Sequence, residues 1–141
     1  MIREDIAAAL FAKLQTAAGF KTASRRLRHW DDVPPAQQPA LFLSLKTEDI
    51  ATVPGLNPVS KITYDAVIYA HTAGNEKVTP SSLLNPLVDA VQATLKPDAA
   101  YNKQTLGGLV QHVWIEGRIV TDEGVLGDQG VVIIPIVMKV A

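Results

Sequence analysis

The sequence predicts an α+β fold in which two helices pack on one mostly antiparallel or mixed β-sheet, in the order αβββαββ. Two segments repeat apolar residues at helical spacing, four others alternate apolar with polar residues in the manner of strands, and a last strand-length segment is apolar on both faces. Helices and strands in this arrangement favour a layer of helices on a sheet. The length of 141 residues suits one continuous core, so we expect a single domain over residues 1–141.

The first helix is predicted over residues 3–17. Ile6, Leu10 and Leu14 are spaced four apart and form the one-sided stripe of an amphipathic helix. Residues 22–30 then change to the two-residue alternation of a strand.

The next part of the chain alternates between proline-rich breaks and strands. Residues 29–40 contain three prolines, which predict an ordered loop between neighbouring strands. Alternation then predicts a short strand over 41–46 and a longer one over 61–71, separated by the turn-rich segment 53–60. Residues 73–75 (Ala-Gly-Asn) are expected to end the longer strand.

The second helix has two possible starts, Thr79-Pro80 and Asn85-Pro86, because each is a capping residue followed by proline at a first helical position. Proline is costly inside a helix. We therefore predict a short turn over 80–84 and a main helix over 86–96.

Two more strands are predicted over 109–121 and 130–140, joined by a long mobile tip over 121–130 that holds three glycines and three acidic residues. The last strand is apolar on both faces, yet Pro135 interrupts it. Since proline is normally confined to edge strands or bulges, we expect this strand to lie at a sheet edge that something covers. In an oligomer such an edge is an interface. The residues expected there are Trp114, Val131, Ile133, Pro135 and Val137.

Composition gives a weaker indication of assembly. Charged residues make up 19% of the chain, below the roughly 25% of ordinary soluble domains. Either part of the surface is covered in an assembly or the protein is a slightly apolar monomer. The formal net charge of −1 argues against a dedicated nucleic-acid binder, which needs excess Lys and Arg. A charged start and the lack of a long apolar run predict a soluble protein with no signal peptide and no membrane partner.

No chemical motif stands out. The chain has no cysteine and no G-x-S-x-G, and its histidines (His29, His71 and His112) lack metal-binding spacing. Adjacent acidic pairs at residues 31–32 and 122–123 fall on predicted loops, where such residues are usually solvated. We therefore expect no enzyme activity, no catalytic residue, no metal and no cofactor.

One alternative from another functional class is a small ligand-binding domain. His112, Glu116 and Arg118 share one face of the predicted strand over 109–121, at about 7 Å for each step of two residues, close enough to contact one ligand.

The basic cluster of Arg25, Arg26 and Arg28 is the most unusual charge feature. It is either a solvated strand face or, repeated around a ring, a surface that lines a channel. In a ring it would contact DNA phosphates non-specifically or pair with acidic residues of a neighbouring copy. The acidic candidates are Asp122, Glu123 and Asp128.

Several packing and turn positions together resemble the tail terminator proteins of long-tailed bacteriophages, through most of the chain. Besides the opening helix and the apolar last strand, they are Arg28-x-Trp30, Gln38-Pro39-Ala40-Leu41, Leu84-x-x-Leu87-x-x-Ala90 with Leu95, Leu106-Gly107-Gly108 and Gly127-Asp128-x-Gly130.

The resemblance implies a small α/β subunit of a six-fold homo-oligomeric ring. Such a ring caps the tail tube, stops its polymerisation and offers its other face to a head-completion or connector protein. The implied partners are therefore the tail tube protein and the connector. The implied location is the head-proximal end of the virion tail, after synthesis in the host cytoplasm. The runner-up is another head–tail connector or baseplate subunit of similar layout.

Overall fold

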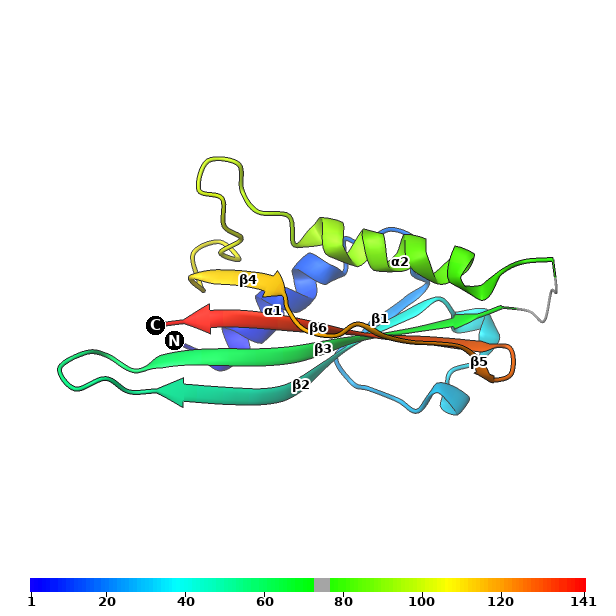
Figure 1. The fold of residues 1–141 in the computed structure, drawn as a ribbon, viewed down its shortest axis with the longest axis horizontal. Coiled ribbons are helices and arrows are strands. Elements are labelled where there is room, and N and C mark those ends of the chain that lie inside the picture. The colour runs from blue at the N-terminus through cyan, green and yellow to red at the C-terminus, as the bar shows by residue number, and fades with distance from the viewer. Residues whose placement is uncertain (73–76) are drawn as a thin grey trace.

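The computed structural model describes residues 1–72 and 77–141, in which two helices lie on one face of a six-stranded sheet (Figure 1). The predicted α+β class is therefore confirmed. Residues 73–75, predicted to end a strand, lie outside the described residues. The elements are α1 (Arg3–Leu14), β1 (Thr22–Ser24), β2 (Ala40–Ala51), β3 (Val59–His71), α2 (Pro80–Thr94), β4 (His112–Ile115), β5 (Val120–Leu126) and β6 (Gln129–Val140).

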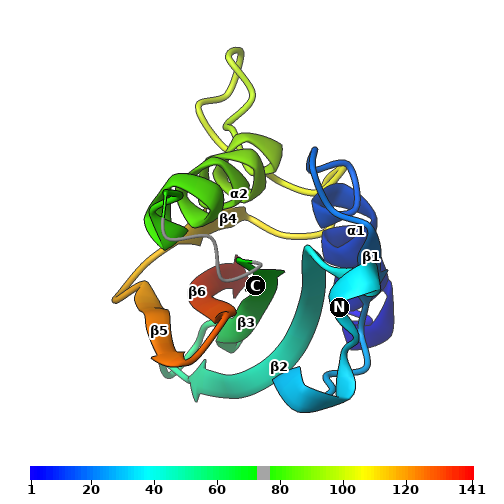
Figure 2. The same cartoon turned by 90° about the vertical axis from the view of Figure 1, so that its right-hand side faces the viewer.

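The sheet has the strand order β1-β2-β3-β6-β4, and β5 pairs with β6 as well. Only β1 and β2 are parallel; all other pairs are antiparallel. The long strand β3 pairs with β2 on one side and with β6 on the other, from Ser60 to His71. Figure 2 shows the sheet curling around the core, with α1 and α2 closing its open side.

The main core lies between the sheet and the helices. Alternate residues of β3 from Ile62 to Ala70 point into it, as the alternation in the sequence predicts. α1 contributes its predicted stripe of Ile6, Leu10 and Leu14, all buried. α2 contributes Leu84, Leu87 and Val91.

The outer face of the sheet has a second, smaller apolar cluster, in which Trp30 and Val33 pack on side chains of β2, β3 and β6. The residues between β1 and β2 cross this face as two short 3-10 turns, Trp30–Asp32 and Pro35–Gln37, so the predicted ordered loop is correct. A pair of buried side-chain amides fastens this loop to β6: Gln38 and Gln129 exchange two hydrogen bonds of 2.9 Å.

Several predicted elements have other bounds. α1 ends at Leu14 rather than at 17, and β2 runs over Ala40–Ala51 rather than 41–46. β1 spans only 22–24 rather than 22–30, because the chain turns away at Ser24, whose hydroxyl accepts the amide of Arg26. α2 is continuous through Pro86, so the predicted break is wrong. A proline inside a helix costs about 3 kcal/mol. Burying Leu84 and Leu87, which are 1% and 7% exposed, offsets it, since each buried leucine contributes about 1.5–3 kcal/mol.

The C-terminal third has three strands where two were predicted. The predicted strand over 109–121 is interrupted at 116–119 and forms β4 and β5. The predicted mobile tip over 121–130 is mostly strand, since β5 runs to Leu126 and a tight turn leads directly into β6.

The expected edge position of the last strand is wrong, because β6 lies between β3 on one side and β4 and β5 on the other. Pro135 is tolerated there because the neighbouring strand is interrupted opposite it. The Pro135 carbonyl accepts the amide of Glu116 at 3.3 Å. A strand residue's N–H and C=O point to the same side in an antiparallel pair, so the donor-less nitrogen faces the break between β4 and β5. Val131, Ile133 and Pro135 are half-buried on the outer face and Val137 is buried.

The amide pair gives a test of how the loop is fastened. Gln129→Leu leaves the amide of Gln38 with an unpaired oxygen in a buried position, so we expect the free energy of unfolding to fall by about 1–3 kcal/mol. Urea denaturation measures it. The double variant Gln38→Leu with Gln129→Leu should lose less than the sum of the two single changes, and strictly additive losses would contradict this coupling.

Candidate functional site: an apolar arm and an apolar cleft

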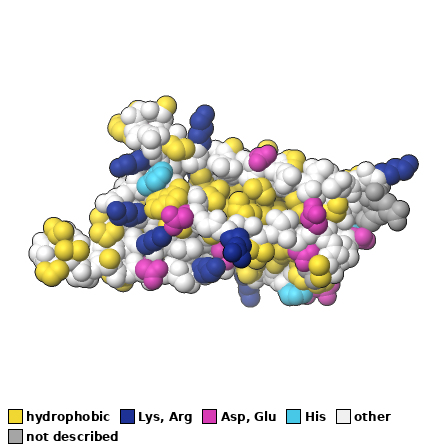
Figure 3. Space-filling view, viewed as in Figure 1, with side chains coloured by type: hydrophobic (Ala, Val, Ile, Leu, Met, Phe, Trp, Pro, Cys, Tyr) yellow, Lys and Arg dark blue, Asp and Glu magenta, His cyan; other side chains and the backbone are white. Residues whose placement is uncertain are grey.

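The hairpin of β2 and β3 extends beyond the rest of the sheet, and we call its residues 50–59 the arm. β6 ends at Val140 opposite Ser60, so the arm has no strand beside it other than its own two. Figure 1 shows it as the projection at the left. The arm has no charged residue, and Ile50, Val53 and Leu56 are 60%, 53% and 69% exposed. Figure 3 shows hydrophobic side chains gathered at this end.

The tip of the arm is shaped by its own turn. The amide of Leu56 donates to the carbonyl of Val53 at 3.0 Å, and Gly55 has a φ of +81°, which favours glycine. Pro54 lies within this turn and Pro58 follows it, and neither has a backbone donor. Prolines at an exposed end oppose the addition of a further strand. The tip therefore offers apolar side chains rather than a hydrogen-bonding edge.

Ion pairs hold the base of the arm from both faces of the sheet. On the helix face, Arg3 donates to both carboxylate oxygens of Glu48, at 2.7 and 2.8 Å, and Ser60 donates to the same carboxylate. On the outer face, Lys61 donates to Glu116 at 2.8 Å. We call these the two base ion pairs. They link the base of the arm to α1 and to the residue that follows β4.

These ion pairs lower the pKa values of their carboxyl groups. The hydrogen bonds from Arg3 lower the pKa of Glu48 below its usual 4.5, and Ser60 lowers it further. The hydrogen bond from Lys61 lowers the pKa of Glu116 in the same way, followed by that from the indole N–H of Trp114 at 3.3 Å. Both carboxyl groups are therefore held in the charged form.

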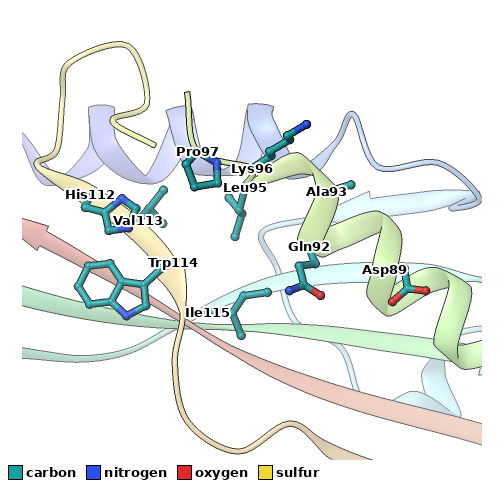
Figure 4. Close-up of a pocket in the computed structure, with 10 residues that line it drawn as sticks. All are labelled: Asp89, Gln92, Ala93, Leu95, Lys96, Pro97, His112, Val113, Trp114 and Ile115. Carbon is teal, nitrogen blue, oxygen red and sulfur yellow. The ribbon is translucent and has the colours of Figure 1, made fainter. Parts of the chain in front are cut away.

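The second feature is a cleft of about 510 Å³ between α2 and β4, shown in Figure 4. β4 is an edge strand, with β6 on its paired side. The floor of the cleft is apolar, and Gln92 of α2 extends over it toward β4. Its apolar lining comes from Leu95, Pro97, Val113, Trp114 and Ile115.

Trp114 is the predicted interface residue that the structure places at this cleft. Its ring is half-buried and stacks on His112, with ring centroids 5.0 Å apart and planes 17° from parallel. Trp114 also lines a second hollow of about 520 Å³ at the base of the arm. An apolar surface therefore continues from the base of the arm to the cleft.

Of the three residues of the ligand-binding alternative, only His112 lies within β4, and Glu116 and Arg118 follow the end of that strand. Nδ1 of His112 accepts the amide of Gln104 at 3.1 Å, and Glu116 is bonded to Lys61 and Trp114. Arg118 lies beyond the end of β4, in the break between β4 and β5.

The predicted charge clusters lie at opposite edges of the sheet. The arginines follow β1 at one edge, and Asp122, Glu123 and Asp128 lie on or beside β5 at the other. Within one chain, Arg25 makes two bonds to Glu4, at 2.6 and 2.9 Å.

The other residues of the two charge clusters have different surroundings. The guanidinium of Arg28 lies 5.5 Å from the ring centroid of Phe42, while Arg26 is exposed. Asp122 accepts the backbone amides of Gly124 and Val125, so its carboxylate shapes the end of β5.

Within residues 1–72 and 77–141, no group of three or more His, Cys, Asp and Glu side chains is placed to hold a metal ion. In the same part of the chain, no helix combines the length and hydropathy that crossing a membrane requires. No protein-family model matches the chain, and no curated protein is detectably similar to it in sequence.

Sequence reasoning treated residues 53–60 only as a turn-rich break and missed the arm. A signal was present, because ten consecutive residues from Ile50 to Val59 are uncharged and include two prolines. Such a segment is too irregular for a buried strand and too apolar for an ordinary surface loop.

The two base ion pairs predict a dependence of stability on acid. A carboxyl whose pKa is lower in the folded state than in the unfolded state stabilises the fold above its unfolded pKa, and that contribution is lost as the pH falls through the folded value. The thermal midpoint should therefore drop as the pH falls below about 4.5. Glu48→Gln should lower the midpoint at neutral pH and flatten this dependence.

Calorimetry over a pH series makes the comparison. Arg3→Gln keeps the carboxyl of Glu48 but removes its partner, so it should flatten the curve as well. A curve as steep in both variants as in the unchanged protein would show that the Arg3–Glu48 pair does not contribute.

Proposed function

We propose that this chain is a non-enzymatic structural subunit that assembles with copies of itself into a ring. The observation that carries the proposal is the arm, whose uncharged and apolar side chains project beyond the sheet. A monomer leaves this surface in water, and large exposed apolar patches usually mark sites of protein association. The interface thus moves from β6, where the sequence predicted it, to the arm.

The ring we propose is a phage tail terminator. It would cap the head-proximal end of the tail tube, stop tube polymerisation and offer its other face to the connector protein. The support is the layout that the sequence shares with that family. Leu84 and Leu87 fix α2 on the sheet, and Gly130 lets Leu84 approach, since a Cβ there would lie 3.1 Å from the Leu84 side chain. The six-fold number and the tail tube and connector partners come from the resemblance.

The charges at the two sheet edges are consistent with a head-to-tail ring. In such a ring one edge of each copy faces the opposite edge of the next. The exposed Arg26 of one copy then approaches Glu123 and Asp128 of its neighbour, as a rim contact that steers assembly more than it stabilises it. The net charge of −1 leaves DNA in the channel as a weak and non-specific contact.

Loss of the protein should change tail length. In the phage or prophage that carries the gene, its disruption should give overlong or headless tails in negative-stain images, because nothing stops the tube. The unchanged gene and an Arg118→Ala variant should both restore normal tails. Tails of normal length that lack another part, such as the baseplate, would instead favour the connector or baseplate alternative.

Light scattering after size-exclusion chromatography tests the ring directly. We expect a closed oligomer, formed alone or on tail tubes. A protein that stays monomeric and does not bind tail tubes would contradict the proposal.

A further inference from the structure

We infer that the arm of one copy seats in the cleft between α2 and β4 of the next copy. This inference rests on the proposed ring and names the contact that builds it. The arm and the cleft are separate surfaces of the same chain, and each is apolar and open to solvent. In a single chain neither the arm nor the cleft contacts another apolar surface. A second copy offers an arm for the cleft and a cleft for the arm.

The chemistry of the two surfaces matches. The arm brings no charged side chain of its own, and the two charged residues that line the cleft, Asp89 and Lys96, are exposed rather than part of its apolar floor. The floor of the cleft consists of Leu95, Val113 and Ile115, with the ring of Trp114 beside them. An aromatic ring in an apolar pocket is the usual centre of a tight protein contact.

The sizes match as well. The cleft of about 510 Å³ lies in the range that admits a small group of side chains. The turn of the arm presents such a group, since Val53, Pro54 and Leu56 are consecutive or nearly so and all are exposed. Its two prolines keep the turn compact, which lowers the entropy that seating it would cost.

A chain cannot fill its own cleft with its arm. The arm projects along the long axis of the molecule, away from α2 (Figure 1). The pairing of β2 with β3, and of β3 with β6 as far as Ser60, sets that direction at the base of the arm. The contact must therefore come from another molecule.

The contact between arm and cleft is heterologous, since each subunit uses two different surfaces. Each added copy covers one arm and one cleft and leaves one of each free, so the series either closes into a ring or continues as a filament. Trp114 lies where the incoming arm would contact the cleft. It lines both the cleft and the hollow at the base of its own arm, so the incoming arm would rest beside the resident one.

Two other occupants are possible, and each predicts a different result. Two arms could pack against each other in a two-fold dimer, which would leave both clefts empty. The arm could instead bind a different protein, such as the tail tube subunit, which would leave the copies uncoupled through this surface.

The absence of native cysteine allows a direct test with a short bis-maleimide cross-linker. Leu56→Cys places a thiol on the tip of the arm, and Gln92→Cys places one over the cleft; both positions are exposed. A mixture of the two single variants should give a cross-linked dimer, whereas either alone should not. The double variant should give a series of cross-linked products larger than the dimer on a denaturing gel.

The outcomes that overturn the inference are distinct. Cross-linking of Leu56→Cys with itself would indicate arm-to-arm packing. A double variant that stops at the dimer would indicate reciprocal exchange in a two-fold pair. The absence of cross-links, both in free protein and on purified tails, would show that the arm does not seat in the cleft. Leu56→Cys mixed with Leu45→Cys is the matched control, since Leu45 is 64% exposed on β2 and lies outside both the arm and the lining of the cleft, and should give no product.

A substitution gives an independent measure. Leu56→Asp places a charge on the tip and should weaken self-association about thirtyfold, as loss of a central contact residue does. Leu45→Asp, the same change at a leucine of β2 that is 64% exposed and lies outside both surfaces, should have little effect. If both variants associate like the unchanged protein while light scattering still shows a ring, the arm-to-cleft contact is wrong and the proposed function stands. If disrupting the gene leaves tails normal, the proposed function itself fails.

Discussion

The pairing of β3 with both of its neighbours is the constraint on which the rest of the structure depends. From Ser60 to Tyr69 this strand is paired with β2 on one side and with β6 on the other, so its alternation decides which side chains enter the core and which face outward. Both helices pack on the side that it makes apolar. The same pairing creates the arm, because β2 and β3 continue past the residue at which β6 ends.

The sequence was sufficient for elements whose signal is local. The stripe of α1 and the alternation of β3 are both visible over one short window, and each was predicted on the correct face. The loop between β1 and β2 was also predicted, because its prolines exclude regular structure whatever surrounds them. The fold class follows from these elements together, since two apolar helix faces require a sheet to cover.

The errors arose where a neighbour distant in sequence decides the outcome. Pro135 was read as a sign of an edge strand, but its missing donor is harmless because the adjoining strand breaks at Glu116. Pro86 was read as a helix start, but the burial of Leu84 and Leu87 carries α2 through it. The candidate interface moved for the same reason, since exposure of the arm depends on where β6 ends, which residues 50–59 do not encode.

An exposed apolar arm promotes non-specific association unless another surface covers it. A closed ring covers the arm of every copy. An open chain of copies leaves one arm and one cleft in water at its ends, whereas closure covers every arm and every cleft. The strand pairing at its base restricts the directions that the arm can take, which reduces the entropy lost when it seats. A stiff arm also fixes the angle between successive copies. If the arm seats as inferred, its rigidity sets the angle between one copy and the next. That angle determines whether the series of copies closes into a ring.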